Sequence, residues 1–266
     1  MYNSIQLATR YLQYYFTASN GKGHGMHSPF VFDFIQNVLN NKSNYNYPSE
    51  IEQLRKQLLH DERMIIQQDL GAGSRKKTSD QKTVAHLVKT ALKPKKYAQL
   101  LYRLAKHYQP RTIVELGTSL GITTAYLSKA DPTAEIITIE GNENIHVIAK
   151  DNFRKTGCEN IEALIGNFDS VLPSVINHLS SHIGLAYIDG NHRYEPTMRY
   201  FTQFLSVIST ESILVFDDIH WSVEMEKAWE EIKAHPGVQY TIDIFFLGFV
   251  FFRKEFKLKQ DFIIRF

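Results

Sequence analysis

The 266-residue chain has little cysteine and no visible leader. Its one cysteine, Cys158, cannot form a disulfide within the chain. The amino terminus, MYNSIQLATRYLQYYF, lacks the basic flank, apolar run and small-residue cleavage site of a secretory signal. We therefore expect a protein of the reducing cytoplasm.

Long apolar runs and an excess of charge are also missing. The longest apolar stretch, IDIFFLGFVFF, is too short to cross a bilayer as a helix, which predicts a soluble protein with no membrane partner. Thirty basic and twenty-eight acidic residues leave a net charge of +2, so a nucleic acid is not expected as the main partner. With 43% hydrophobic residues, the chain can bury a full core.

The first 94 residues are patterned as helices and loops. Ser28 followed by Pro29 is typical of a helix start. Ser49 with Glu52 three residues later predicts a capping box. The helices expected here cover residues 4–16, 28–40 and 49–63. We therefore predict a helical amino-terminal extension over residues 1–94.

From residue 95 onward, short β-rich runs alternate with helical segments. The runs are TIVEL, EIITIE, IEALIG, IGLAYID, SILVFDD and the pair YTIDIFF and FVFFR. This alternation over short loops predicts an α/β domain at residues 95–266, with a mostly parallel, Rossmann-like sheet covered by helices on both faces. Leu247 and Gly248 are too few for a crossover, so the last pair is expected to be an antiparallel hairpin.

Two glycine-rich stretches are candidates for a nucleotide-binding loop: DLGAGS at residues 69–74 and ELGTSLG at residues 115–121. Such a loop must leave the carboxyl end of a strand and open a helix. Only the second stretch lies between a strand pattern and a helix pattern, and Gly117 and Gly121 remove side chains where the backbone must bend. The first stretch is interpreted as a surface turn, with a lid over the site as the alternative.

Glu140 ends the strand that follows the second loop. An acidic side chain at this place can accept both hydroxyls of a ribose, although a solvated strand end is the alternative. Ser119 stands where the dinucleotide motif has its middle glycine. A ligand with a ribose but no pyrophosphate therefore fits better than a dinucleotide.

The segment from Glu115 to Thr123, with Glu140, resembles the first two motifs of class I S-adenosylmethionine-dependent methyltransferases, and most closely their catechol O-methyltransferase-like branch. The resemblance covers about residues 95 to 253. It implies a seven-stranded sheet with an antiparallel last strand, and S-adenosylmethionine as the cofactor. The cofactor-binding residues that it implies are Glu115, Gly117, Thr118, Gly121, Thr123, Glu140, Asn167, Phe168 and Asp189.

Asn167 and Phe168 suit the adenine by their own chemistry as well. An amide can hydrogen-bond the edge of a base, and an aromatic ring can stack on its face. The alternative is that the pair forms an ordinary helix start with a phenylalanine in the core.

Three aspartates follow the later strands. Asp189 ends one strand, and Asp217 and Asp218 end the next. Adjacent parallel strands end side by side, so these carboxylates should converge, and they repel one another unless a cation balances them. Oxygen ligands suit Mg²⁺, Mn²⁺ or Ca²⁺, although capping of the following helices is the alternative. Metal-dependent O-methyltransferases carry matching aspartates, which makes Mg²⁺ the expected ion.

His192 lies three residues after the first of these aspartates, where many enzymes of the resembled branch have a lysine base. Histidine can take a proton near neutral pH, so His192 is the predicted catalytic base beside Asp189. A histidine that only orients the aspartates is the alternative, with Tyr194 or water then accepting the proton. His220 and Trp221 are candidates for the lining of a substrate pocket.

The sequence thus predicts an S-adenosylmethionine-dependent enzyme that methylates an oxygen of a small molecule with the help of a divalent cation. Methylation of RNA or protein, and a cofactor-binding module without catalysis, are the alternatives. The extension is expected to close over the site. His24 and His27 are interpreted as parts of a structured loop. The acceptor and the oligomeric state, including a homodimer, stay open.

Overall fold

The computed structural model contains two compact units. The first joins Met1–Asn40 to Leu179–Phe266, and the second is Asn41–His178. The residues that it describes are 1–41, 45–66, 81–179, 182–256 and 258–266. The stretch DLGAGS lies outside them. Within these ranges, no helix has the length and apolar character needed to cross a membrane.

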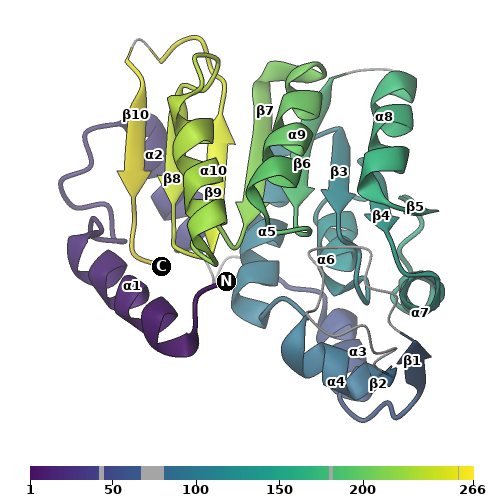
Figure 1. Ribbon diagram of the computed structural model, residues 1–266. Helices are drawn as coiled ribbons and strands as arrows, with labels where there is room; N and C mark the ends of the chain where they lie inside the picture. The colour runs from purple at the N-terminus through teal and green to yellow at the C-terminus, as the bar shows by residue number, and fades with distance from the viewer. Residues whose placement is uncertain (42–44, 67–80, 180–181, 257) are drawn as a thin grey trace. The chain divides into compact units, whose positions relative to one another are not determined.

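The second unit carries three parallel strands (Figure 1). These are β3 (Thr112–Leu116), β4 (Glu135–Glu140) and β5 (Ile161–Ile165). Its helices are α3 (Ser49–Leu58), α4 (Val84–Thr90), α5 (Lys95–Tyr108), α6 (Ile122–Ala130), α7 (Glu143–Lys155) and α8 (Phe168–His178), with a small hairpin of β1 (Met64–Ile66) and β2 (Gln81–Thr83). Each of β3 and β4 is followed by a helix, as the alternating pattern predicts.

The first unit carries the other strands of the central mixed sheet, in the order β10-β8-β9-β7-β6. They are β6 (Ile183–Ile188), β7 (Ile208–Asp217), β8 (Tyr240–Asp243), β9 (Leu247–Phe251) and β10 (Gln260–Ile263). Its helices are α1 (Ser4–Thr17), α2 (Pro29–Asp33), the π-helix η1 (Phe34–Leu39), α9 (Tyr194–Leu205) and α10 (Val223–Ala234). β6 and β7 are parallel, whereas β9 runs antiparallel to both β7 and β8.

Alternating residues of β9 explain how helices cover both faces of this part of the sheet. Phe249 packs edge-on against Phe34 of η1, with ring centroids 5.1 Å apart. Gly248 points to the other face, where a Cβ atom would lie 2.6 Å from the Trp229 ring of α10. Successive side chains of a strand point to opposite faces, so one hydrophobic strand packs against both helical layers.

Two details of the predicted sheet are wrong. The hairpin turn is formed by residues 244–246, and Leu247 and Gly248 belong to β9. The sheet has eight strands rather than seven because β10 adds a parallel strand beside β8. Gln260–Ile263 is a short and mostly exposed edge strand, so it lacks the apolar pattern that marks the other strands.

Helix starts were predicted with mixed success. Ser28 caps α2, with Pro29 at its first position, which confirms that prediction. The capping box at Ser49 is wrong, because α3 begins after Pro48 without a side-chain cap and the Glu52 carboxylate instead accepts from Tyr126 and Arg55. A capping box that the sequence reading missed joins Asn3 and Gln6 at the start of α1.

The amino-terminal extension contributes to both units. Its first part, with α1, α2 and η1, belongs to the first unit, and its later part, from α3 to α4, belongs to the second. The boundary between residues 94 and 95, and the closing of the extension over a site, stay predictions.

Candidate functional site

The predicted site residues fall into two sets, one in each unit. The cofactor-binding residues from Glu115 to Phe168 belong to the second unit; Asp189, which was predicted for both the cofactor and the cation, belongs with the acidic set to the first unit. The cofactor set begins with the loop between β3 and α6, where Gly117 and Gly121 have φ angles of 102° and 77°. A Cβ atom on Gly121 would lie 2.5 Å from the Phe153 ring of α7, so both the backbone angle and the space require glycine there.

Glu115 is fully buried at the end of β3 and ties the loop to its surroundings. Its Oε2 accepts hydrogen bonds from the hydroxyls of Thr124 in α6, at 2.5 Å, and Thr138 in β4, at 2.6 Å. The Thr118 and Thr138 hydroxyls are 2.6 Å apart. These contacts fix the start of the loop, while Thr123 is buried in the first turn of α6.

Glu140 is held at the carboxyl end of β4 by backbone amides. Its Oε2 accepts from the amide of Ser119 at 2.8 Å, and its Oε1 accepts from the amide of Asn142 at 2.9 Å. Ser119 itself adopts a left-handed φ of 49°. Hydrogen bonds to the charged form favour a carboxylate, so Glu140 is set as an acceptor beside the glycine loop.

The last two residues of the cofactor set open α8. The Asn167 side-chain oxygen accepts from the amide of Asp169 at 2.8 Å, which is the helix-start role that the sequence reading kept as an alternative. Phe168 is the first residue of α8 and is half-buried. A role of this pair at the adenine stays a prediction.

The acidic set lies at the carboxyl ends of the parallel strands β6 and β7. Asp189, His192 and Asp217 each offer one ligand atom, and these three atoms lie within 4.8 Å of one another. His192 Nε2 is 3.6 Å from Asp189 Oδ1, and the Tyr187 hydroxyl donates to Asp189 Oδ2 at 2.8 Å. Asp217 is buried, whereas Asp189 and His192 are partly exposed.

Asp218 is not a member of this three-residue group. It adopts a left-handed φ of 53°, and its amide donates to the Phe246 carbonyl at 2.8 Å. Asn191, which lies between Asp189 and His192 in the chain, has a similar φ of 54°. Asn and Asp adopt this conformation more readily than other non-glycine residues, which suits both positions to the turns after β6 and β7.

The donor chemistry of the acidic set fits a divalent cation. Two carboxylates within a few ångströms can supply oxygen ligands while leaving positions for an acceptor molecule, and the imidazole of His192 lies beside them. Without a positive charge, the two carboxylates would repel each other. Asp189 and Asp217 therefore fit Mg²⁺ or Mn²⁺.

A network of polar contacts surrounds His220, and the sequence did not predict it. His220 Nε2 lies 2.7 Å from Asp243 Oδ2, and its Nδ1 lies 3.3 Å from Glu226 Oε1. Burial lowers the pKa of His220, but hydrogen bonds and charges from Asp243 and Glu226 outweigh it, so that the pKa is raised. His220 was predicted as pocket lining; Glu226 and Asp243, which hold it, lie 6 and 23 positions away, and no motif marks this pairing.

Tyr194, the alternative proton acceptor, points toward α10. Its hydroxyl donates to Glu231, and the Lys227 ammonium lies 3.9 Å from the centre of its ring. These contacts explain its orientation without any role at the acidic set.

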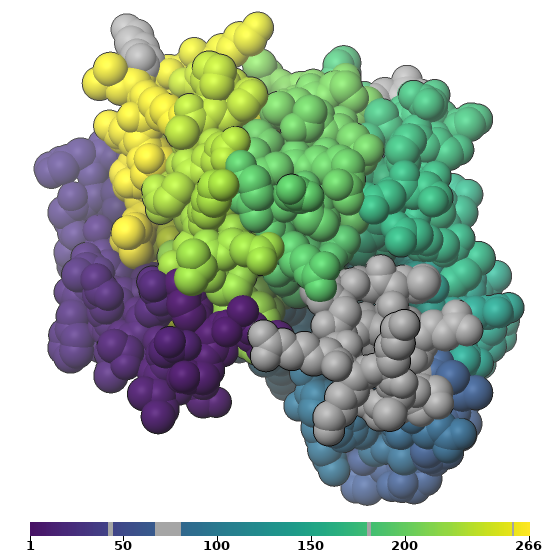
Figure 2. Space-filling model, in the orientation of Figure 1, coloured from purple at the N-terminus to yellow at the C-terminus, as the bar shows by residue number. Residues whose placement is uncertain are grey.

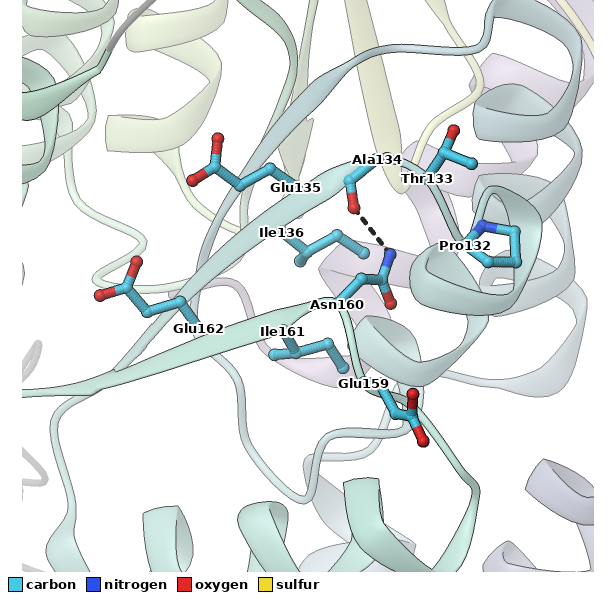
Figure 3. A pocket seen from close by; sticks show the side chains of 9 residues that line it. All are labelled: Pro132, Thr133, Ala134, Glu135, Ile136, Glu159, Asn160, Ile161 and Glu162. Carbon is cyan, nitrogen blue, oxygen red and sulfur yellow. Dashed lines mark hydrogen bonds between the residues drawn. The ribbon is translucent and has the colours of Figure 1, made fainter.

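A hollow of about 390 Å³ lies elsewhere in the second unit (Figure 3). Its walls include Glu135 and Ile161, which begin β4 and β5, and Asn160 bridges them by donating to the Ala134 carbonyl at 2.7 Å. Ligands of parallel α/β sheets bind at the carboxyl ends of the strands. This hollow is at the amino ends, so it is no part of the candidate site.

Residues 114–219 match the sequence profile of a family described as a methyltransferase domain. The match begins in β3 and ends just after Asp218. Catechol O-methyltransferase from Niastella koreensis is 25% identical over 146 residues, which are 54% of this chain and 62% of that protein. A second curated relative, an uncharacterized protein of Acanthamoeba polyphaga mimivirus, is 24% identical, and this chain spans 59% of its length.

Solved structures of methyltransferases resemble the whole fold. The O-methyltransferase from Bacillus cereus in complex with S-adenosylhomocysteine (SAH) has a TM-score of 0.54 at 17% identity, covering 84% of this chain and 97% of that one. The SAH-bound methyltransferase PaMTH1 from Podospora anserina has a TM-score of 0.60 at 13% identity, covering 96% and 98%. Residues 114–219 therefore resemble a methyltransferase domain in sequence, and the chain shares the fold of these solved methyltransferases.

Proposed function

We propose that this protein transfers a methyl group from S-adenosylmethionine to an oxygen atom of a small molecule, with the help of a divalent cation. The observation that carries the proposal is the acidic set, Asp189, His192 and Asp217, inside a methyltransferase domain. The catechol O-methyltransferase relative supports oxygen as the accepting atom.

The cofactor is assigned to the second unit. The Glu140 carboxylate, fixed by two backbone amides, suits the two ribose hydroxyls, and the Gly117 to Gly121 turn suits the amino-acid end. SAH in two of the solved structures supports this assignment. S-adenosylmethionine supplies a methyl group on a sulfonium, which is already a good leaving group.

The acceptor is assigned to the acidic set of the first unit. Asp189 and Asp217 would hold the cation, which, when bound, lowers the pKa of an alcohol or phenol close to it. His192 takes the acceptor's proton at Nε2. The acceptor oxygen then forms a bond to the methyl carbon while the carbon–sulfur bond breaks, which leaves SAH and a protonated His192.

The test combines binding with product detection. Calorimetry should show binding of SAH and of Mn²⁺ by the purified protein, and labelled S-adenosylmethionine with Mg²⁺ should methylate members of a panel of phenols and alcohols. Full turnover in excess chelator would remove the cation from the proposal. Cofactor binding without any methylated product would favour a non-catalytic module, and strong salt-dependent RNA binding would favour a nucleic-acid substrate.

A further inference from the structure

The amino-terminal helix α1 is tied to α10 by one carboxylate. Glu226 Oε1 accepts from the Arg10 guanidinium at 2.7 Å, and its Oε2 accepts from the Tyr2 hydroxyl at 2.7 Å. The Arg10 guanidinium also lies over the Tyr2 ring, 4.2 Å from its centre. In Figure 1, α1 (purple) lies below β8 and α10, and in Figure 2 its purple surface adjoins the yellow-green surface of the carboxyl-terminal part.

The same carboxylate continues the chain of contacts to His220. Glu226 faces one nitrogen of the ring, and Asp243 at the end of β8 faces the other. The His220 ring also stacks on Phe245, with 5.1 Å between centroids and 24° between planes. Both ring nitrogens and one ring face are therefore engaged, so His220 is held in one orientation.

The turn between β8 and β9 receives a second contact from α1. Tyr11 and Tyr14 of α1 lie 5.1 and 5.3 Å from the Phe245 ring, centroid to centroid. Phe245 has a left-handed φ of 72°, and its amide donates to Asp243 Oδ1 at 2.7 Å. A bulky residue in that conformation persists only where its surroundings fix it. Here α1 and Asp243 provide those surroundings.

Both sets of contacts, the one through Glu226 and the one through Phe245, lead to the segment that follows β7. The Phe246 carbonyl accepts from the amide of Asp218, and the Trp221 carbonyl accepts from the amide of Tyr2 at 3.0 Å. His220 lies between these two points. The segment from Asp217 to Trp221 is thus anchored to the β8–β9 turn, to α10 and to the start of α1.

We propose that α1, acting through Glu226, His220 and Asp243, positions the carboxyl end of β7 for the cation and the acceptor. His220 is a positioning residue, because both of its nitrogens already face carboxylates. This inference rests on the proposed function. Partners that hydrogen-bond directly to metal ligands change metal affinity by about ten- to a hundredfold when removed; this network acts on Asp217 through the backbone of the segment that ends at Trp221, so the lower end of that range is expected.

Full-length variants test the inference by Mn²⁺ and SAH titrations. Glu226→Gln and His220→Asn should raise the Mn²⁺ dissociation constant about tenfold, while the SAH dissociation constant stays within about twofold because Glu140 and its loop belong to the other unit. Glu230→Gln is the matched control on α10, since its partner is Lys233 at 2.7 Å. It should leave both constants unchanged.

A milder pair of variants covers the case in which a variant fails to fold. Arg10→Met should weaken Mn²⁺ binding, and Arg10→Lys, which keeps a cation near Glu226, should restore part of it. Equal Mn²⁺ affinity in all variants and in the unchanged protein would overturn the positioning role alone. Equal loss of Mn²⁺ and SAH binding would also overturn it, as general destabilisation. If the unchanged protein bound no Mn²⁺, the metal step of the proposed function would fall, and the positioning role with it.

Discussion

The cofactor loop of the second unit and the Glu226–His220 network of the first unit depend on contacts of different range. In the second unit, Glu140 is fixed by the amides of Ser119 and Asn142, 21 and 2 positions away in the chain. In the first unit, the network behind the acidic set joins Glu226 to Arg10 and Tyr2, 216 and 224 positions away. A motif can therefore describe the cofactor loop, whereas the contacts of Glu226 with the amino-terminal segment form only in the folded chain.

The largest expected effect comes from breaking the short-range set. Gly121→Ala should abolish detectable SAH binding, because a left-handed non-glycine residue costs about 1–2 kcal/mol and the new Cβ would overlap the Phe153 ring at 2.5 Å. Calorimetry with SAH measures the loss. Gly25→Ala is the control, since Gly25 has a similar φ of 80° but no atom within 4 Å of the added carbon. If the two variants bound SAH equally well, the loop would have the wrong assignment.

The next prediction separates cation binding in the first unit from cofactor binding in the second. Asp189→Asn should weaken Mn²⁺ binding more than about tenfold by removing one negative ligand, and it should leave the SAH dissociation constant within about threefold. Paired titrations of the same sample measure both. Asp151→Asn, which loses only surface contacts to Lys155 at 2.8 Å and Arg154 at 3.6 Å, should change neither constant. A parallel loss of SAH affinity would contradict the separate assignment.

A smaller effect tests the base within the acidic set. His192→Ala should lower turnover by about 10²-fold or more near neutral pH, and raising the pH should recover part of the rate as the acceptor ionises without help. The measurement is the pH–rate profile with saturating cofactor and Mg²⁺. An unchanged profile would leave His192 with an orienting role.

Much of the fold could be predicted because local patterns agree with the tertiary structure. The predicted strands TIVEL and EIITIE match β3 and β4 to the residue. Each is a buried parallel strand between a loop and a helix, and such strands are continuous apolar runs. β10 was missed because an exposed edge strand carries no such run.

Part of the geometry of the candidate site could be predicted as well. That Asp189 and Asp217 come together follows from the rule that neighbouring parallel strands end side by side, since β6 and β7 are paired in parallel. The backbone amide of Asp218 donates to the Phe246 carbonyl in the β8–β9 turn, and no sequence pattern predicts this contact. The contacts of Glu226 to α1 could not be foreseen, because helix patterns do not say which distant carboxylate a surface arginine meets.

The smallest expected effect is on the pH dependence of stability, to which one histidine in each unit contributes with opposite sign. Burial, and then the charge of Lys150, lower the pKa of His146 in α7, and its Nδ1 has no hydrogen-bond partner among the described residues. At acidic pH, His146 therefore binds a proton in the unfolded chain more readily than in the folded chain. Stability falls as the pH drops below the ordinary histidine pKa of about 6.5.

His220 has the opposite sign, because Asp243 and Glu226 raise its pKa despite the burial that lowers it. Its contribution to stability is complete below the ordinary histidine pKa and is lost as the pH rises through the raised value. Burial, and then the contact with Glu226, raise the pKa of Tyr2, so its hydroxyl stays protonated across this range. In melting curves recorded from about pH 5 to pH 9, His146→Leu should flatten the acidic side and His220→Asn the alkaline side. The reverse pattern would contradict both assignments, because each variant removes the titration of one histidine only.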